Sequence, residues 1–372
     1  MSTLATRLPR DLHPVAWWVW ALGLATAASL TTNPLALLVL VAVAGVVVVA
    51  RRGDHPWARS FRLYVGLGVA IVLIRILFRI MFGGVETGHV LVHLPEIPLP
   101  GWVAGVRLLG PVTRESVLAG LYDGMRLAAI VICVGAANSL ANPKRLLKSV
   151  PPALYEIGTA LVVAVTIFPQ LADSVRRVRA AQSLRAGATG RIGRLRRFLV
   201  PVLEDALERS LALAAGMDTR GYGRSAGQSA RQRLTTGGLL LGGLCGMSVG
   251  VYAVLDQSAP RLLAAPLLAA GALVALVGLW SAGRRVRRTR YRPDRWDWPE
   301  LAVAGAGLAV AVAAWWVSDH QLLVTNPGVD ATPHLSMTAL LGLLVGLTPA
   351  GVAPRPVLPV AASRLVVSEV AG

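Results

Sequence analysis

The 372-residue sequence has few charged residues, almost no lysine and only two cysteines. Charged residues make up 15% of it, well below the ~25% that is usual for soluble domains. A soluble globular fold is therefore excluded, and the hydrophobic content of 55% indicates a chain that crosses a membrane several times. Cys133 and Cys245 both lie in apolar stretches, which excludes a disulfide framework and a cysteine-based metal site.

The sequence also lacks the motifs of common enzymes. Neither Lys144 nor Lys148 follows a glycine, so there is no phosphate-binding loop and the chain is not itself a P-loop ATPase. The pattern G-x-S-x-G occurs at 223–227 and 246–250, but without the strand and helix that a nucleophile elbow needs. We expect no enzyme activity, no catalytic residue, no metal and no cofactor, so energy must come from a partner or an ion gradient.

Nine apolar segments are long enough to be considered as membrane spans. They are Val15–Leu30, Pro34–Ala50, Leu63–Phe82, Val117–Leu140, Ala153–Leu171, Thr236–Leu255, Leu262–Ala282, Leu301–Val317 and Met337–Ala353. The loop 83–116 contains His89 and His93 with two nearby glutamates; a transition-metal site there is the minor alternative to a solvated loop.

Positive charge sets the predicted orientation. The net charge is +18, and residues 141–235 alone contain sixteen Lys or Arg. The arginines lie between apolar runs, as in cytoplasmic loops, rather than in the basic patch of a soluble nucleic-acid-binding fold. This bias places both termini in the cytoplasm. It is satisfied throughout only if 153–171 stays on the cytoplasmic side, which leaves eight crossings.

We therefore predict an all-α polytopic membrane protein of the cell membrane, with about eight transmembrane helices and no nucleic-acid partner. The expected regions are four N-terminal helices (1–140), cytoplasmic coupling helices (141–235), C-terminal transmembrane helices (236–353) and a cytoplasmic tail (354–372).

Two arginine motifs flank an amphipathic pattern in the cytoplasmic region. The first is Arg185-Ala186-Gly187 and the second is Thr219-Arg220-Gly221. Between them, apolar residues recur at helical spacing from Leu195 to Ala214, with Pro201 either kinking the helix or starting it. Two similar arginines held apart suit a partner with two similar pockets, since the planar guanidinium makes bidentate contacts to carboxylates. Ordinary juxtamembrane arginines are the alternative.

With Pro169-Gln170-Leu171, Asn33-Pro34, Gly124-Met125-Arg126-Leu127 and Asn142-Pro143-Lys144-Arg145, these motifs resemble the EcfT/CbiQ family over about residues 10–255. The family is the transmembrane coupling subunit of energy-coupling factor importers of the ABC type, which take up vitamins or metal ions such as cobalt. The resemblance implies that Arg185 and Arg220 dock into two ABC-type ATPase subunits. It also implies a small membrane subunit that binds the substrate.

Charged and small residues inside the apolar segments form two further sets. Arg75 and Arg79 in the third span, with Asp123 and Arg126 in the fourth, are expected to pair and tie these spans together. An ion path is the alternative. Glycines recur at every fourth position and permit close helix packing: Gly238, Gly242, Gly246 and Gly250.

Two other functions stay open at this point. One is a self-contained secondary transporter that uses the four charged residues of the third and fourth spans. The other is a membrane anchor for a signalling complex.

Overall fold

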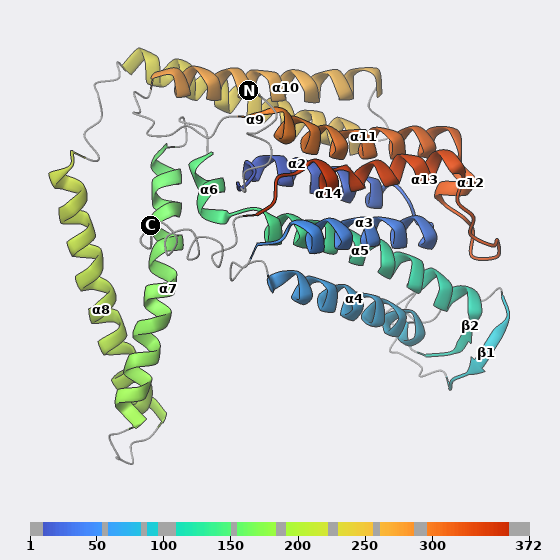
Figure 1. Cartoon of the computed structure of the whole chain (residues 1–372), viewed down its shortest axis with the longest axis horizontal. Coiled ribbons are helices and arrows are strands. Elements are labelled where there is room, and N and C mark those ends of the chain that lie inside the picture. The colour runs from blue at the N-terminus through green and yellow to red at the C-terminus, as the bar shows by residue number, and fades with distance from the viewer. Residues whose placement is uncertain are drawn as a thin grey trace, which may run out of the picture. The chain divides into compact units, whose positions relative to one another are not determined.

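The computed structural model describes residues 10–53, 59–82, 88–95, 109–149, 155–183, 191–221, 230–255, 261–285 and 296–356. These residues are overwhelmingly helical, and the chain divides into two compact units (Figure 1). Unit 1 comprises 1–146 and 292–372, and unit 2 comprises 147–291. The C-terminal helices of the sequence are therefore divided between the two units.

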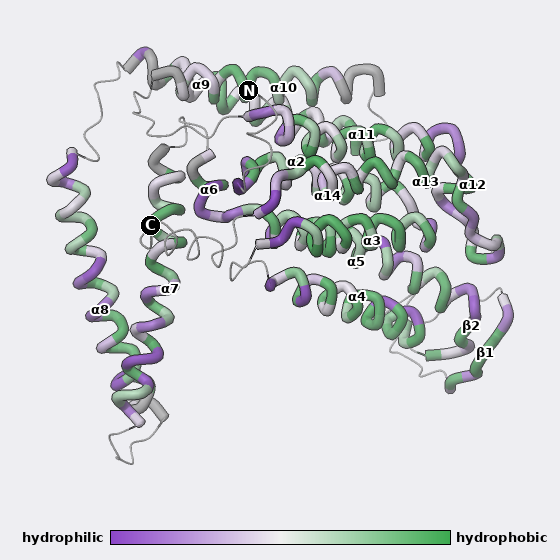
Figure 2. The backbone as a smooth tube through the Cα atoms, viewed as in Figure 1, coloured by the Kyte–Doolittle hydropathy of each residue, from purple (hydrophilic) through white to green (hydrophobic). Residues whose placement is uncertain are grey.

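Seven of the described helices are long and apolar enough to cross a membrane, and the prediction of an all-α polytopic membrane protein is confirmed. In Figure 2 the apolar colour runs along most of α3 and α11, whereas polar and apolar residues alternate along α8. These seven include Ile157–Ser183, the segment that the charge pattern places in the cytoplasm.

Unit 1 begins with four helices whose first residues follow clear starting signals. They are α2 (Pro14–Ser29), α3 (Pro34–Arg51), α4 (Phe61–Met81) and α5 (Arg114–Leu140). Proline is the first residue of α2 and α3, where its missing N–H costs nothing. The side chains of His13, Asn33 and Thr113 accept hydrogen bonds from the first turns of α2, α3 and α5, as N-cap residues do.

The end of the chain returns to pack on these helices. It forms α11 (Trp298–His320), α12 (Leu322–Thr325), α13 (Met337–Leu344), the short 3-10 turn η3 (Val345–Leu347) and α14 (Thr348–Val352). The predicted span 337–353 is thus broken into three pieces, because Pro349 lacks the N–H that a continuous helix requires.

Close helix contact in unit 1 depends on glycine. A Cβ atom added at Gly23 of α2 would overlap the backbone of Gly307 in α11, and one added at Gly307 would overlap the backbone of Trp20. The core around this crossing contains large side chains with no more than 2% exposure: Trp20, Leu24, Leu37, Leu40, Val43, Val47, Val303 and Val310.

A small antiparallel ribbon departs from the all-helical expectation. β1 (Val90–His93) pairs with β2 (Pro111–Thr113) ahead of α5. Of the candidate metal ligands, His89 directly precedes β1 and His93 is its last residue. Among the residues that the structure describes, no group of three His, Cys, Asp or Glu side chains could hold a metal ion.

Unit 2 consists of two antiparallel helix pairs, preceded by the short α6 (Pro143–Lys148), which links the units. The first pair is α7 (Tyr155–Ser183) with α8 (Arg191–Thr219), and the second is α9 (Ala230–Leu255) with α10 (Arg261–Arg285). Figure 1 shows α7 and α8 close together at one end and separated at the other.

Candidate functional site

The second arginine motif forms the end of α8. Gly221 has φ of +74°, a left-handed conformation that glycine adopts without a steric penalty. Its N–H donates to the carbonyl of Asp218 (2.9 Å), and the Arg220 N–H donates to that of Met217 (3.2 Å). The helix therefore ends at Thr219, and Arg220 and Gly221 form the turn that follows it.

This termination leaves the Arg220 side chain exposed at the end of a long helix. Within the described part of the chain, no acidic side chain forms an ion pair with Arg220. Its guanidinium is thus available to a partner. The first motif, Arg185-Ala186-Gly187, lies outside the described residues, but it begins two positions after the last residue of α7.

The apolar residues of α8 divide into two rows. Phe198, Val202 and Ala206 are half-buried. A second row at every fourth position is exposed by 41% to 70% of its side-chain surface: Leu195, Leu199, Leu203, Leu207 and Leu211. The helix runs through Pro201 without interruption, so its amphipathic pattern is continuous. Its exposed leucines form an apolar surface without a covering element among the residues described.

A polar cluster joins α7 to α8. The Asp205 carboxylate accepts from Arg209 Nε (3.0 Å) on its own helix and from Arg177 Nη2 (3.4 Å) on α7. Arg209 Nη1 also donates to Gln170 Oε1 of α7 at 3.4 Å. Hydrogen bonds from Ser174 and Arg209 lower the pKa of Asp205 below its ordinary value. Ser174 itself is only 2% exposed.

The charged residues of α4 and α5 do not all pair with one another. Arg79 Nη2 contacts Asp123 Oδ2 at 3.3 Å and links the two helices. Arg126 instead donates to the carbonyl of Ser29, the last residue of α2. Arg75 is exposed, and its backbone packs against α5, since a Cβ atom at Gly120 would approach the Arg75 carbonyl oxygen to 3.4 Å.

A family model described as "CbiQ: Cobalt transport protein" matches residues 5–230, well over half of the chain. The chain belongs to the CbiQ family. This match confirms the resemblance inferred from the sequence motifs. No curated protein matches the chain. CbiQ proteins are membrane components of transport systems rather than a family of enzymes.

The CbiQ match ends near the start of α9, yet later residues complete unit 1. Arg10 forms ion pairs with Asp297 (2.9 Å) and with Glu300 (3.1 Å), which is buried. Trp20 Nε1 donates to the carbonyl of Gly346 (3.1 Å), and Arg51 donates to the carbonyl of Ala350. The C-terminal helices are thus an integral part of the bundle.

Only part of the predicted glycine row of α9 faces α10. Gly246 packs on Gly271 and Gly250 packs on Leu268, whereas added Cβ atoms at Gly238 and Gly242 would meet nothing within 4 Å. A further close contact with α10 is made by Gly243, which is outside the predicted row and lies against Ala275. A four-residue spacing turns by 400°, so such a row drifts around the helix by 40° per step. Glycines spaced alternately by three and four residues, as Gly243, Gly246 and Gly250 are, stay on one face of the helix.

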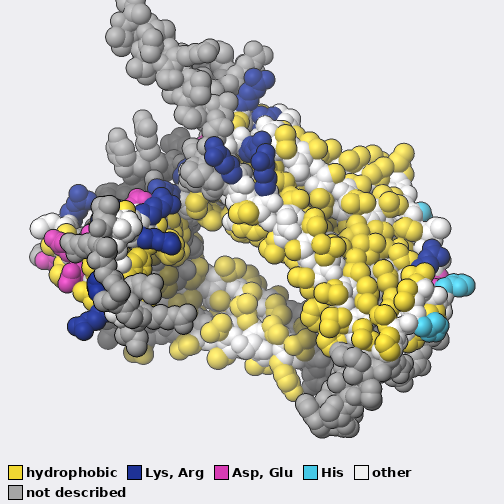
Figure 3. Space-filling view, turned by 90° about the horizontal axis from the view of Figure 1, so that it is seen from below, with side chains coloured by type: hydrophobic (Ala, Val, Ile, Leu, Met, Phe, Trp, Pro, Cys, Tyr) yellow, Lys and Arg dark blue, Asp and Glu magenta, His cyan; other side chains and the backbone are white. Residues whose placement is uncertain are grey.

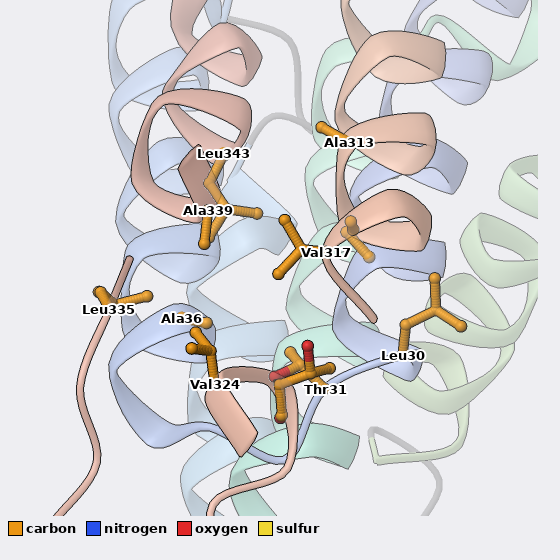
Figure 4. Close-up of a pocket in the computed structure, with 12 residues that line it drawn as sticks. Leu30, Thr31, Ala36, Ala313, Val317, Val324, Leu335, Ala339 and Leu343 are labelled. Carbon is orange, nitrogen blue, oxygen red and sulfur yellow. The ribbon is translucent and has the colours of Figure 1, made fainter. Parts of the chain in front are cut away.

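A cavity of about 30 Å³ lies between α2, α3, α11 and α13 (Figure 4). Its walls are almost entirely apolar and include Leu30, Ala36, Val317, Val324 and Leu343, with Thr31 at one edge. This volume holds one or two water molecules. It is far too small for a vitamin, and its apolar lining does not suit a metal ion.

The Asp205 cluster was not predicted from the sequence. A detectable signal was present, because Asp205 and Arg209 are spaced by four residues and lie beside the apolar row of α8. A polar pair at that position predicts a polar partner on the neighbouring helix.

Proposed function

We propose that this CbiQ protein is the coupling component of an energy-coupling factor importer. In this proposal, Arg185 and Arg220 dock into two ABC-type ATPase subunits, and the chain passes their motion to a separate membrane subunit that binds the substrate. The observation that carries the proposal is Arg220, held exposed beyond the last turn of α8 by the left-handed Gly221.

The form of α8 supports two docking points rather than one. Its 29 residues extend over about 43 Å at 1.5 Å per residue. One arginine motif follows its last helical residue and the other precedes its first turn. Two points separated in this way fit two similar subunits bound side by side. Arginine suits such contacts because its five N–H donors bind a carboxylate bidentately.

The exposed leucine row of α8 supports a third partner. Such a contiguous apolar row is unfavourable in water and marks a surface that binds a protein or a membrane. In Figure 3 the α7–α8 pair also carries basic and acidic side chains, whereas the bundle of unit 1 has a broad apolar surface. A hydrophobic substrate-binding subunit would cover the leucines. The family description makes Co²⁺ the first substrate to test.

Native co-purification tests the proposal. The tagged chain, extracted from its own membranes in mild detergent, should retain two ATPase subunits and one small hydrophobic protein. Loss of a desolvated arginine contact costs ~2–5 kcal/mol. At ~1.4 kcal/mol per tenfold change, Arg220→Ala should weaken ATPase association by about 30-fold or more.

Arg197→Ala is the matched control. Arg197 is exposed on the same helix, and its replacement removes the same charge, so association should change by less than about fivefold. Absence of ATPases from the wild-type preparation would overturn the proposal. Equal effects of the two substitutions would show that Arg220 is not a docking residue.

A further inference from the structure

The contacts between α7 and α8 are concentrated in a short region of each helix. Asp205 contacts Arg177 and Ser174, and Arg209 contacts Gln170. These partners fall within eight consecutive residues of α7 and five of α8. Toward the opposite end the helices separate (Figure 1). The two helices are therefore held together by residues 170–177 of α7 and 205–209 of α8, which form the fastened region, and they separate beyond it.

The fastened region lies between the last residue of α7, Ser183, and Arg220 at the end of α8. Arg220 is fifteen residues beyond Asp205, which corresponds to about 22 Å of helix. The end of α7 at Ser183 is nine residues beyond Ser174, or about 14 Å, and the first motif follows it directly. A rotation of α8 about the fastened region would thus move the two motifs relative to each other.

The hydrogen bonds and ion pairs of Asp205 suit a fixed pivot between the two helices. Apolar packing, such as that of the half-buried Phe198 and Val202, is non-directional and tolerates sliding. A carboxylate that contacts two guanidinium groups and a buried hydroxyl is directional, because hydrogen bonds to a charged group have a preferred geometry. Asp205 is supplied by α8, while two of its three partners are supplied by α7.

We propose that the Asp205 cluster, composed of Ser174, Arg177, Asp205 and Arg209, is the fulcrum that transmits movement between the two ATPase-docking motifs. The inference rests on the proposed function, since it assigns Asp205 a positioning role in coupling. Asp205 does not contact the ATPases in this proposal. It fixes the helix register, so that displacement at one motif becomes displacement at the other.

Spin labels on both helices test this proposal in the full chain. Labels replace Ala180, exposed on α7, and Gly216 on α8, where an added side chain meets nothing within 4 Å. Exposed Cys245 is replaced by serine. Without nucleotide, the wild-type chain should give one narrow distance distribution. With its ATPases and a non-hydrolysable ATP analogue, the distribution should shift while staying narrow.

Relocating the carboxylate separates a fulcrum from a merely stabilising residue. Asp205→Ser should broaden the distribution at least twofold and abolish the nucleotide-dependent shift. The double variant Ser174→Asp/Asp205→Ser moves the carboxylate to α7, to the position whose side chain Asp205 contacts across the helix pair. It should restore both the narrow distribution and the shift. Asp173→Ser is the control, because that exposed carboxylate pairs with Arg176 on its own helix.

The two readouts separate failure of the fulcrum from failure of the proposed function. If Asp205→Ser leaves the distribution of the chain alone narrow, the fulcrum is overturned, whatever the ATPases do. Failure of the double variant to restore a narrow distribution also overturns it. If the wild-type chain is narrow but never binds ATPases, the proposed function fails and the coupling role of the fulcrum fails with it.

Discussion

Asn33 offers the most direct test of how the C-terminal helices complete the membrane bundle. Its side chain is fully buried and makes three hydrogen bonds. Oδ1 accepts from the N–H of Leu35 (3.0 Å) as the cap of α3. Nδ2 donates to the carbonyls of Val324 and His334, both at 2.8 Å. One residue therefore joins the start of α3 to α12 and to the loop before α13.

The expected cost of Asn33→Ala can be assembled from these contacts. Loss of an N-cap costs ~1 kcal/mol. Each carbonyl left without a partner costs ~1–3 kcal/mol in a buried site, although side-chain hydrogen bonds between membrane helices average only ~0.6 kcal/mol. The free energy of unfolding should fall by about 2–7 kcal/mol. Asn33→Asp keeps the cap acceptor but loses both donors, so it should be nearly as destabilising.

Thermal unfolding of the detergent-purified chain would measure this loss, with Asn326→Ala as the control. Asn326 accepts a single exposed hydrogen bond from Thr32 (3.1 Å), so its replacement should cost less than ~1 kcal/mol. Equal stability of the Asn33 and Asn326 variants would refute the reasoning. The C-terminal segment would then be a peripheral addition rather than part of the bundle.

Two further predictions concern helix contacts. Gly307→Ala forces a methyl group into the backbone of α2, so it should lower the free energy of unfolding by ~1–3 kcal/mol. Gly305→Ala, whose Cβ meets nothing within 4 Å on the same helix, should be neutral or slightly stabilising; thermal unfolding compares them. The α7–α8 pair should also respond to acid. Because the pKa of Asp205 is lowered from 3.8, its stabilising contribution is complete above that value. It is lost as the pH falls through the lower, folded-state pKa. The spin-label distribution should therefore broaden on acidification, and it should be independent of pH over this range in Asp205→Asn.

The sequence predicted most helices because long apolar runs and cap residues are local signals. The expected span 117–140 is close to the observed Arg114–Leu140. By contrast, the segment expected at 153–171 continues to Ser183. Pro169 does not end it, and the following residues are rich in alanine and arginine, which favour helix formation.

The contacts between distant elements could not be predicted in the same way. Arg10 and Glu300 are separated by 290 positions, and nothing near either residue specifies the other. The close contact of Gly307 with α2 could not be predicted either, because a glycine in an apolar helix can face a neighbouring backbone or open space. Gly305, two positions earlier, faces open space. Only the packed structure distinguishes the two.

The membrane side on which α7 lies can be inferred from contacts at both ends of the segment that contains it. Arg145, just after α5, donates to the carbonyls of Asp11 (2.9 Å) and Leu12 (3.3 Å), directly before α2. Asp297, just before α11, contacts Arg10. Both ends of the segment 146–296 therefore lie at the N-terminal end of α2, on the same side of the bundle.

A segment that leaves and returns to one side crosses the membrane an even number of times. The antiparallel helices α9 and α10 are both long and apolar enough to cross, and together they would contribute two crossings, whereas α8 is not among the candidate spans. A crossing by α7 would make the total odd, so we predict that α7 stays on the side of the N-terminus, which the arginine bias predicts to be cytoplasmic. Single cysteines at 147, 180 and 288, in a chain without Cys133 and Cys245, should all react with a membrane-impermeant maleimide only from the cytoplasmic side. Opposite labelling of positions 147 and 180 would show that α7 crosses. One helix of the α9–α10 pair would then have to remain outside the membrane, because the contacts of Arg145 and Asp297 still require an even number.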